Sequence, residues 1–370
     1  MSEPIRILHM IGTFEMGGSQ AMILNLYRGI DRSKVQFDFI VDHPDMDALL
    51  PAFKDLGANV FIMPSFKGTN YADIKREWNT FFKEHPEYKI LHSHVRSYAS
   101  IYLPIAKKHG LKTIIHSHST SNGSGIKSYV KWLMQLPLRY QADYFFGCSK
   151  EAGEWLFGKR IVNGEKYHML QNAIDIKKYE LNESIRKQYR DELSIGEHTL
   201  VFMHVGRLHE AKNHIFLLEV FSKYHSRHAD SVLVIVGDGM LRKEIEDKIE
   251  DLSINEAVKM LGARNDVPNL LQAADCFLFP SKWEGLPVTI VEAQAAGLPC
   301  LVSDTVTRDV NVSDLVKNLP IDHGSDSWVN AIENMHFSKK DVTEDIVKAG
   351  FDIQSSAEWM ENFYRGIVNE

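Results

Sequence analysis

Several features of common protein classes are missing from this sequence of 370 residues. No window approaches the roughly 18 consecutive apolar residues that a membrane-spanning helix needs, so we expect any membrane contact to be peripheral. Residues Met1–Arg6 lead into a β-like segment without the regions of an export signal, and we therefore expect a cytoplasmic protein. Positive charge is not in excess, because 42 Lys and Arg face 49 Asp and Glu. We do not expect a nucleic-acid partner.

Cysteine is also scarce, with only Cys148, Cys276 and Cys300 in the chain. Their odd number and wide spacing argue against a disulfide framework, and the absence of a Cys-x-x-Cys pair argues against a thiolate metal site. Each lies in an apolar, strand-like run. We predict buried, reduced thiols.

What the sequence does contain is a regular alternation of short β-like runs and helical patterns, which is typical of repeated βαβ units with parallel sheets. The length fits two domains. The first series of strands is predicted at Ile5–Met10, Phe37–Val41, Asn59–Met63, Ile90–Ser93, Thr113–His116 and Tyr144–Cys148. The second is predicted at Thr199–Val205, Val232–Val236, Val258–Leu261, Cys276–Phe279 and Cys300–Ser303. The fold class is therefore α/β, with two Rossmann-like, doubly wound domains.

A charged, polar stretch at Asp175–Glu197 separates the two series and is predicted to be the interdomain connection. The N-terminal domain is then 1–174, and the C-terminal domain is 175–354. The end of the chain, 355–370, is predicted to be a C-terminal amphipathic helix, since apolar side chains recur at helical spacing in Ser356–Val368. Ligands of parallel sheets bind beyond the carboxyl ends of the strands, so two facing sheets would enclose a deep cleft.

Two glutamates follow the predicted strand Cys276–Phe279. Glu284 lies in the loop, and Glu292 lies one to two turns into the predicted helix Val288–Ala296, so both can border one ligand beside free backbone N–H groups. Pro287 suits the first position of that helix. The alternative is a loop charge and a solvated helix residue.

Cations follow the predicted strand Thr199–Val205 in the same way. Gly206 permits a tight turn, and Arg207 and Lys212 precede the helical run Ile215–Tyr224. A guanidinium fork, an ammonium and a helix start together suit a diphosphate. Ordinary surface cations are the alternative. The first strand of the chain ends in a turn with Gly17 and Gly18, which matches neither a P-loop nor a dinucleotide fingerprint and could be a plain turn.

Histidines cluster after two predicted strands, as His92 and His94 and as His116 and His118. We expect the members of each pair to lie on opposite strand faces. A metal site is disfavoured, because no carboxylate or thiolate accompanies them at ligand spacing. His118 precedes a polar, glycine-containing run and is predicted to bond a polar ligand, although a structural role remains open.

Cations and aromatics then alternate around Lys127, Tyr129, Lys131 and Trp132. Such a segment can lie on a membrane surface. A helix that packs its apolar side on its own sheet is the preferred interpretation.

In combination, these positions resemble the retaining GT-B glycosyltransferases of family GT4, especially those of exopolysaccharide and capsule gene clusters. The similarity covers nearly the whole chain. Its motifs are Gly17-Gly18, Asn172-Ala173-Ile174-Asp175, Gly206-Arg207 with Lys212, Gly237-Asp238-Gly239, Leu261-Gly262, and Glu284 with Glu292. The chain departs from the family pattern at Pro287, at Ala173 where Gly is common, and at Gln20 where Glu is frequent.

The resemblance implies a nucleotide-sugar site built mainly from the C-terminal domain, an acceptor site mainly in the N-terminal one, and a C-terminal helix that crosses back to the N-terminal domain. Glu292 would bind ribose, Arg207 and Lys212 the diphosphate, and Glu284 and His118 the transferred sugar. The implied catalytic positions are Glu284, Arg207, Lys212 and His118. The implied donor-binding positions are Gly17, Gly18, Gly206, Gly262, Ala263, Arg264, Gly285, Leu286 and Glu292. No metal is expected, because Arg207 and Lys212 would meet the charge of the departing diphosphate, and the nucleotide-sugar is a substrate rather than a cofactor.

The implied reaction is retaining transfer of a hexose or N-acetylhexosamine, from a UDP-sugar by resemblance, to a lipid-linked exopolysaccharide or capsule acceptor. Peripheral contact with the inner face of the membrane is expected near Lys127, Lys131 and Trp132. Two alternatives remain: a nucleotide-sugar epimerase of GT-B architecture, and a two-lobed, non-catalytic sugar-binding protein, which would need an export signal.

Overall fold

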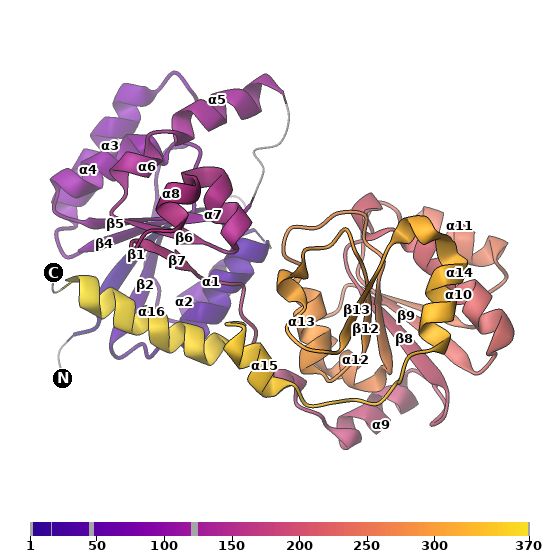
Figure 1. Cartoon of the computed structure of the whole chain (residues 1–370). Helices are drawn as coiled ribbons and strands as arrows, with labels where there is room; N and C mark the ends of the chain where they lie inside the picture. The colour runs from indigo at the N-terminus through magenta and orange to yellow at the C-terminus, as the bar shows by residue number, and fades with distance from the viewer. Residues whose placement is uncertain (1–2, 16, 44–47, 120–124, 369–370) are drawn as a thin grey trace. The chain divides into compact units, whose positions relative to one another are not determined.

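The computed structural model describes residues 3–15, 17–43, 48–119 and 125–368. The chain divides into two compact units. The first comprises Met1–Ala173 and Asp352–Glu370, and the second comprises Ile174–Phe351. Each unit contains one parallel sheet with helices around it (Figure 1). Within the described ranges, no helix has both the length and the apolar character needed to cross a membrane.

The sheet of the first unit has the strand order β3-β2-β1-β4-β5-β6-β7. The order reverses between β1 and β4, which makes this the switch point where doubly wound sheets bind ligands. Residues of β1 and β4 pair in register, with His9 opposite His92. The strands are β1 (Ile5–Gly12), β2 (Val35–Val41), β3 (Val60–Ile62), β4 (Ile90–Ser93), β5 (Lys112–Ser117), β6 (Tyr144–Gly147) and β7 (Tyr167–Met169).

The helices of the first unit pack on this sheet, and the end of the chain returns to it. In α16, Ala357, Met360 and Tyr364 are buried, which confirms the predicted amphipathic helix. A Cβ at Gly29 of α1 would lie 3.0 Å from Cβ of Ala357, so glycine lets the two helices approach closely. The helices are α1 (Gly18–Gly29), α2 (Leu50–Asp55), α3 (Tyr71–Glu84), α4 (Ala99–Lys108), α5 (Ile126–Gln135), α6 (Leu138–Gln141), α7 (Lys150–Phe157), α8 (Lys159–Val162) and α16 (Ile353–Val368).

The sheet of the second unit has the order β10-β9-β8-β11-β12-β13, with its switch point between β8 and β11. Its strands are β8 (Leu200–Val205), β9 (Ser231–Val236), β10 (Val258–Gly262), β11 (Cys276–Phe279), β12 (Cys300–Ser303) and β13 (Val316–Leu319). Its α-helices are α9 (Glu183–Glu192), α10 (His214–Arg227), α11 (Arg242–Asp251), α12 (Val267–Ala273), α13 (Val288–Ala295), α14 (Gly324–Glu333) and α15 (Thr343–Lys348). The 3-10 turns η1 (Ile176–Tyr179), η2 (Glu210–Lys212), η3 (Arg308–Val310) and η4 (Ile321–His323) complete the unit.

The segment Asp175–Glu197, predicted to be the interdomain connection, comes directly after the boundary between the two units. It forms η1 and α9 of the second unit. The guanidinium groups of Arg186 and Arg190 lie 2.6 and 3.4 Å from the carboxylate of Asp275. These two arginines therefore hold the segment to the body of the second unit.

The three cysteines are free and buried, as predicted. Burial raises the pKa of the Cys148 thiol to about 11. At neutral pH this thiol is protonated, so it is a poor nucleophile.

Candidate functional site

Two glycine-containing turns pack against each other at the carboxyl edge of the second sheet. A Cβ at Gly237, whose φ is +138°, would lie 2.0 Å from the carbonyl oxygen of Gly206, and one at Gly239 would lie 2.4 Å from that of Leu208. Only glycine permits such contact between backbones. The turn after β8 is therefore held firmly, and it leaves the Arg207 side chain exposed.

Lys212 and Glu284 meet at the switch point of this sheet, one after β8 and the other after β11. Lys212 Nζ lies 2.7 Å from a carboxylate oxygen of Glu284, and the two side chains are only 16% and 13% exposed. The ammonium also lies 4.5 Å from the centre of the Phe279 ring, within cation-π range. The structure thus brings together two predicted catalytic residues that are far apart in the sequence.

Two hydrogen bonds fix these loops to each other. Lys282 N–H donates to the carbonyl of Ala211 over 2.7 Å, and the Asn213 side-chain amide donates to that of Pro280 over 3.2 Å. Asn213 has φ +56°, a conformation that Asn tolerates better than most residues. These bonds hold the two loops that carry Lys212 and Glu284.

Glu292 lies in α13, as predicted, and has a partner that sequence reasoning missed. The Tyr179 hydroxyl of η1 donates to a Glu292 carboxylate oxygen over 2.8 Å. Burial raises the pKa of Glu292, while the Tyr179 bond opposes this rise. The two residues are 113 positions apart, so no spacing pattern could have revealed the pair. Among the described contacts, no hydrogen bond or ion pair joins Glu292 to Glu284.

The prediction for Pro287 was wrong by one position. The helix begins at Val288, and Pro287 precedes it with φ −78° and ψ 91°. An extended ψ places proline outside the helix. Gly285 is exposed, Leu286 is partly buried, and a Cβ at Gly285 would meet no atom within 4 Å.

The turn Gly262-Ala263-Arg264 begins at the last residue of β10, where Gly262 has φ +68°. The guanidinium of Arg264 lies 2.6 Å from Asp266 and is thereby held on its own turn. No contact in the described ranges joins this turn to Lys212 or Glu284.

In the first unit, Gly17 and Gly18 lie at the start of α1. Gly17 is extended, and a Cβ at Gly18 would meet nothing within 4 Å. The fold itself therefore does not require glycine at Gly18, and close approach of a ligand remains a prediction. Ala173 has no positive φ, so the strain considered there does not arise.

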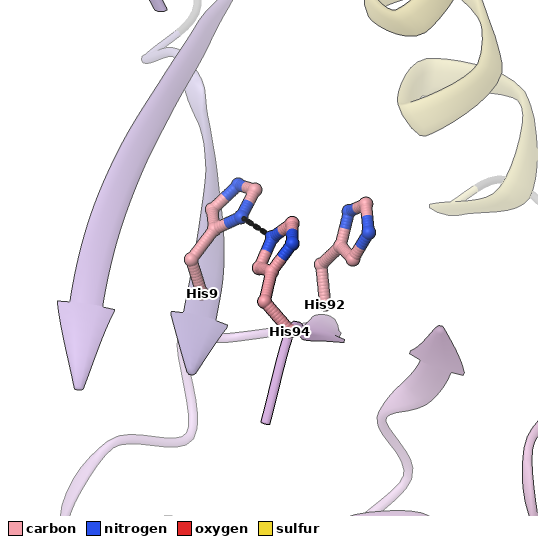
Figure 2. A group of neighbouring side chains, drawn as sticks. All are labelled: His9, His92 and His94. Carbon is pink, nitrogen blue, oxygen red and sulfur yellow. Dashed lines mark hydrogen bonds between the residues drawn. The ribbon is translucent and has the colours of Figure 1, made fainter. Parts of the chain in front are cut away.

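Five histidines gather beside the switch point of the first sheet. The expectation of opposite faces was wrong, because residues two apart in a strand share a face. The rings of His92 and His94 lie 4.4 Å apart between centroids, and those of His116 and His118 lie 4.0 Å apart. His9 of β1, which the sequence analysis did not single out, joins them (Figure 2).

Ring nitrogens of His9, His92 and His94 lie within 4.8 Å of one another, as do those of His94, His116 and His118. Burial and, after it, the nearby charge of Arg96 lower the pKa of His118 to about 3. The rings are therefore neutral near pH 7. Neutral imidazoles can ligate a metal or bond one another, and their relative orientation decides between these uses.

The preferred interpretation of α5 holds only for Met134, which packs against the core of the first unit, because most of the other described apolar side chains of α5 are exposed. Tyr129, Val130, Trp132 and Leu133 are 61%, 48%, 41% and 44% exposed, and Lys131 is exposed beside them. The Lys127 side chain and residues 120–124 of the predicted polar run lie outside the described residues. Apolar periodicity shows that a helix has an apolar side but not what covers it.

Two family models match the chain in succession. The model "Glycosyltransferase Family 4" matches residues 16–178, and "Glycosyl transferases group 1" matches residues 185–349. EpsF of Bacillus subtilis (strain 168), whose assignment as a glycosyltransferase is provisional, is 31% identical over 97% of this chain and 96% of its own. An Escherichia coli UDP-Gal:alpha-D-GlcNAc-diphosphoundecaprenol alpha-1,3-galactosyltransferase is 28% identical over 76% of each chain.

Solved structures share the fold at lower identity. Anabaena HepE in complex with UDP and glucose superposes with a TM-score of 0.68, at 17% identity over 96% of this chain and 95% of HepE. A glycosyltransferase from Rickettsia africae ESF-5 has a TM-score of 0.76, at 15% identity over 99% of both chains. With two parallel sheets, two successive family models and a full-length relative, the chain belongs to glycosyltransferase family 4 and has the GT-B fold.

Proposed function

We propose that this enzyme transfers a hexose or N-acetylhexosamine, with retention, from a UDP-sugar to a lipid-linked precursor of an exopolysaccharide or capsule. The observation that carries the proposal is the Lys212–Glu284 pair, 2.7 Å apart at the switch point of the second sheet and next to the exposed Arg207. A cation pair and a carboxylate at this edge suit a diphosphate and a sugar.

The chemistry follows from where charge develops. When the anomeric bond breaks, the sugar becomes oxocarbenium-like and the departing nucleoside diphosphate gains negative charge. Arg207 and Lys212 then bind the transition state more strongly than the substrate, which lowers the barrier. Glu284 pairs with Lys212 until the substrate binds, and it then orients the sugar. In the retaining path we propose, the departing phosphate oxygen accepts the proton of the acceptor hydroxyl.

Glu292 and Tyr179 are assigned to the ribose. A carboxylate accepts hydrogen bonds from two vicinal hydroxyls, and the Tyr179 bond holds one of its oxygens in place. UDP is favoured as the nucleotide because the Escherichia coli relative is named for UDP-Gal and HepE was solved with UDP. We propose that no metal takes part, since two cations already face the departing phosphate.

Thermal shift with a panel of nucleotide-sugars tests the donor, because ligand binding raises apparent stability by mass action. Transfer to a synthetic undecaprenyl-diphosphate sugar then tests the reaction. A transferase consumes the donor only when an acceptor hydroxyl is present. Interconversion of the donor sugar without acceptor would identify an epimerase instead, and no turnover with any donor would refute the proposal.

We further propose that the exposed side of α5 rests on an anionic membrane that carries the acceptor. Its aromatic side chains suit the lipid interface, and Lys131 adds attraction of about 1 kcal/mol near anionic headgroups. The doubly substituted Trp132→Ala, Leu133→Ala enzyme should sediment less with phosphatidylglycerol vesicles at low salt. Trp359→Ala is the matched control, because Trp359 of α16 has the same 41% exposure as Trp132. Equal loss in both variants, or no sedimentation of the wild type, would contradict this role.

A further inference from the structure

Three of the histidines in the first unit form a hydrogen-bonded chain. His9 Nδ1 lies 3.1 Å from His94 Nε2, and His94 Nδ1 lies 2.8 Å from His118 Nε2. Figure 2 shows the first of these bonds, with the His92 ring beside it. His92 does not continue the chain, because its Nδ1 bonds the Tyr364 hydroxyl of α16 over 2.6 Å. We call His9, His94 and His118 the histidine chain.

The rings of the histidine chain meet head-on. The ring centroids are 5.4 Å apart in the His9–His94 pair and 5.1 Å apart in the His94–His118 pair. Each separation exceeds the N···N distance of the same pair by 2.3 Å, which is twice the distance from the centre of an imidazole ring to one of its atoms. Each N···N line therefore runs along both rings, as in a straight N–H···N bond. A zinc ion between two such in-line nitrogens would need them about 4 Å apart, since each Zn–N bond is about 2.0–2.1 Å. The orientation thus fits a hydrogen-bond chain and not a metal site.

Every ring in the chain is neutral near pH 7. Burial lowers the pKa of His9 to about 3 and the pKa of His94 well below its ordinary value, and His118 behaves like His9. A neutral imidazole has one N–H and one lone pair. The two bonds must therefore run in the same direction, either from His9 to His118 or from His118 to His9.

The inner end of the chain decides the direction. His9 is 1% exposed, its ring lies 4.3 Å from Phe37 and 5.4 Å from Phe39 between centroids, and its Nε2 has no hydrogen-bond partner among the described residues. A proton on this nitrogen would be an orphaned buried donor, which is rarer in proteins than an orphaned acceptor. The proton therefore belongs on Nδ1, so His9 donates to His94 and His94 donates to His118.

At the outer end, His118 must then carry its proton on Nδ1, since its Nε2 accepts the bond from His94. Within the described ranges this Nδ1 is buried and has no partner, so its proton is unpaired until an acceptor meets it. His118 follows β5 at the carboxyl edge of the sheet and is partly exposed as a residue, whereas His9 is 1% exposed, so only the outer end of the chain can gain such an acceptor. This is the edge where ligands of doubly wound sheets bind.

We propose that His9 and His94 are positioning residues that hold His118 in the Nδ1–H tautomer, so that His118 donates a hydrogen bond to an oxygen of the bound nucleotide-sugar. His118 then cannot remove a proton from the acceptor hydroxyl, because no lone pair faces the ligand. The oxygen partner rests on the proposed function, whereas the tautomer does not.

Nitrogen-15 NMR of histidine-labelled, EDTA-treated full-length enzyme tests the tautomer directly, because protonated and bare ring nitrogens resonate far apart. The His118→Gln variant identifies the His118 signals by their loss. We expect a protonated Nδ1 and a bare Nε2 in the wild type. An Nε2–H tautomer, an imidazolium, or a stoichiometric shift of the His9 and His94 signals on adding Zn²⁺ would overturn the proposal.

Two substitutions at one position test the role of the chain. In His94→Gln the amide can still accept from His9 and donate to His118, so we expect an unchanged tautomer and nearly unchanged kcat/KM. In His94→Leu we expect mixed tautomers of His118 and a loss of kcat/KM of roughly tenfold or more, as expected for a weakened hydrogen bond.

His116→Leu is the matched control for this loss. The His116 ring stacks on His118 at 4.0 Å, but both its nitrogens lack partners among the described residues. The His116→Leu variant should leave the His118 tautomer and kcat/KM unchanged. If His94→Leu behaves like His116→Leu, the chain has no positioning role. An Nδ1–H tautomer in an enzyme that transfers no sugar would instead refute the proposed function alone.

Discussion

Replacing Lys212 with alanine tests the centre of the proposed mechanism. In the wild type, Lys212 Nζ lies 2.7 Å from Glu284, and both side chains are less than one-fifth exposed. One charge-assisted hydrogen bond to the departing diphosphate contributes about 1.5–3 kcal/mol. We therefore expect kcat/KM to fall roughly 10- to 150-fold.

The same substitution should also lower stability, because it leaves the Glu284 carboxylate without its cation. Breaking a fully buried pair costs about 3–5 kcal/mol, and the residual exposure of this pair suggests about 2 kcal/mol. Adding Glu284→Gln should restore part of that stability, since a buried amide costs less than an unpaired charge. It should not restore activity.

The assays are steady-state transfer kinetics and chemical denaturation on the same preparations. Lys282→Ala is the matched control, because Lys282 lies in the neighbouring loop and pairs with Glu210 over 3.3 Å at 38% exposure. Lys212→Arg keeps the charge and should retain part of the activity. Transfer by Lys212→Ala at the level of Lys282→Ala, even with lowered stability, would show that the Lys212–Glu284 pair is structural and refute the reasoning.

Three further predictions follow from other parts of the chain. Tyr179→Phe should raise the KM for the nucleotide-sugar severalfold with little change in kcat, because it frees Glu292 without touching the reacting atoms; a fall in kcat alone would contradict the ribose assignment. Transfer should continue in excess EDTA, and activity that returns only with added Mg²⁺ or Mn²⁺ would disprove metal independence. His116→Leu should leave stability unchanged or raise it by about 1 kcal/mol, because it removes a buried imidazole with no hydrogen bonds among the described residues. It should also reduce the acid sensitivity of the fold. Below the ordinary histidine pKa of 6.5, the ring of His116 is protonated in the unfolded chain but stays neutral in the folded one, because its pKa is lowered there. In the wild type this ring therefore lowers the free energy of unfolding, as the pH is lowered, by up to about 1.4 kcal/mol per pH unit. Urea denaturation between about pH 5 and about pH 7.5 measures this slope, and equal slopes in variant and wild type would count against it.

Buried strands were predictable because their apolar runs end at polar or turn residues. The limits of β4, β11 and β12 agree with the sequence-based prediction residue for residue. Strands β7 and β13 were missed, since Tyr167–Met169 and Val316–Leu319 are short and only partly apolar. Each is a strand only because it pairs with the neighbouring strand, β6 or β12, of its sheet.

For helices, too, the residues of the segment itself predict some features, and the tertiary structure decides others. Proline suits the first position of a helix, so the prediction placed Pro287 inside the helix that carries Glu292, whereas α13 begins at Val288. The apolar side of α5 was predicted correctly as apolar, but apart from Met134 most of its described side chains are exposed. A local pattern predicts the element but not the neighbour that covers it.

The sequence by itself determined the two doubly wound sheets, the loops at their carboxyl edges and the residue types that these loops carry. Such features depend on local periodicity and on the order of strands along the chain. Only the tertiary structure decided which side chains meet: Lys212 with Glu284, Tyr179 with Glu292, and His9 with His94. The last pair is separated by 85 residues, and the register of β1 on β4 brings it together. Contacts of this kind depend on strand pairing and packing, which leave no fixed spacing in the sequence.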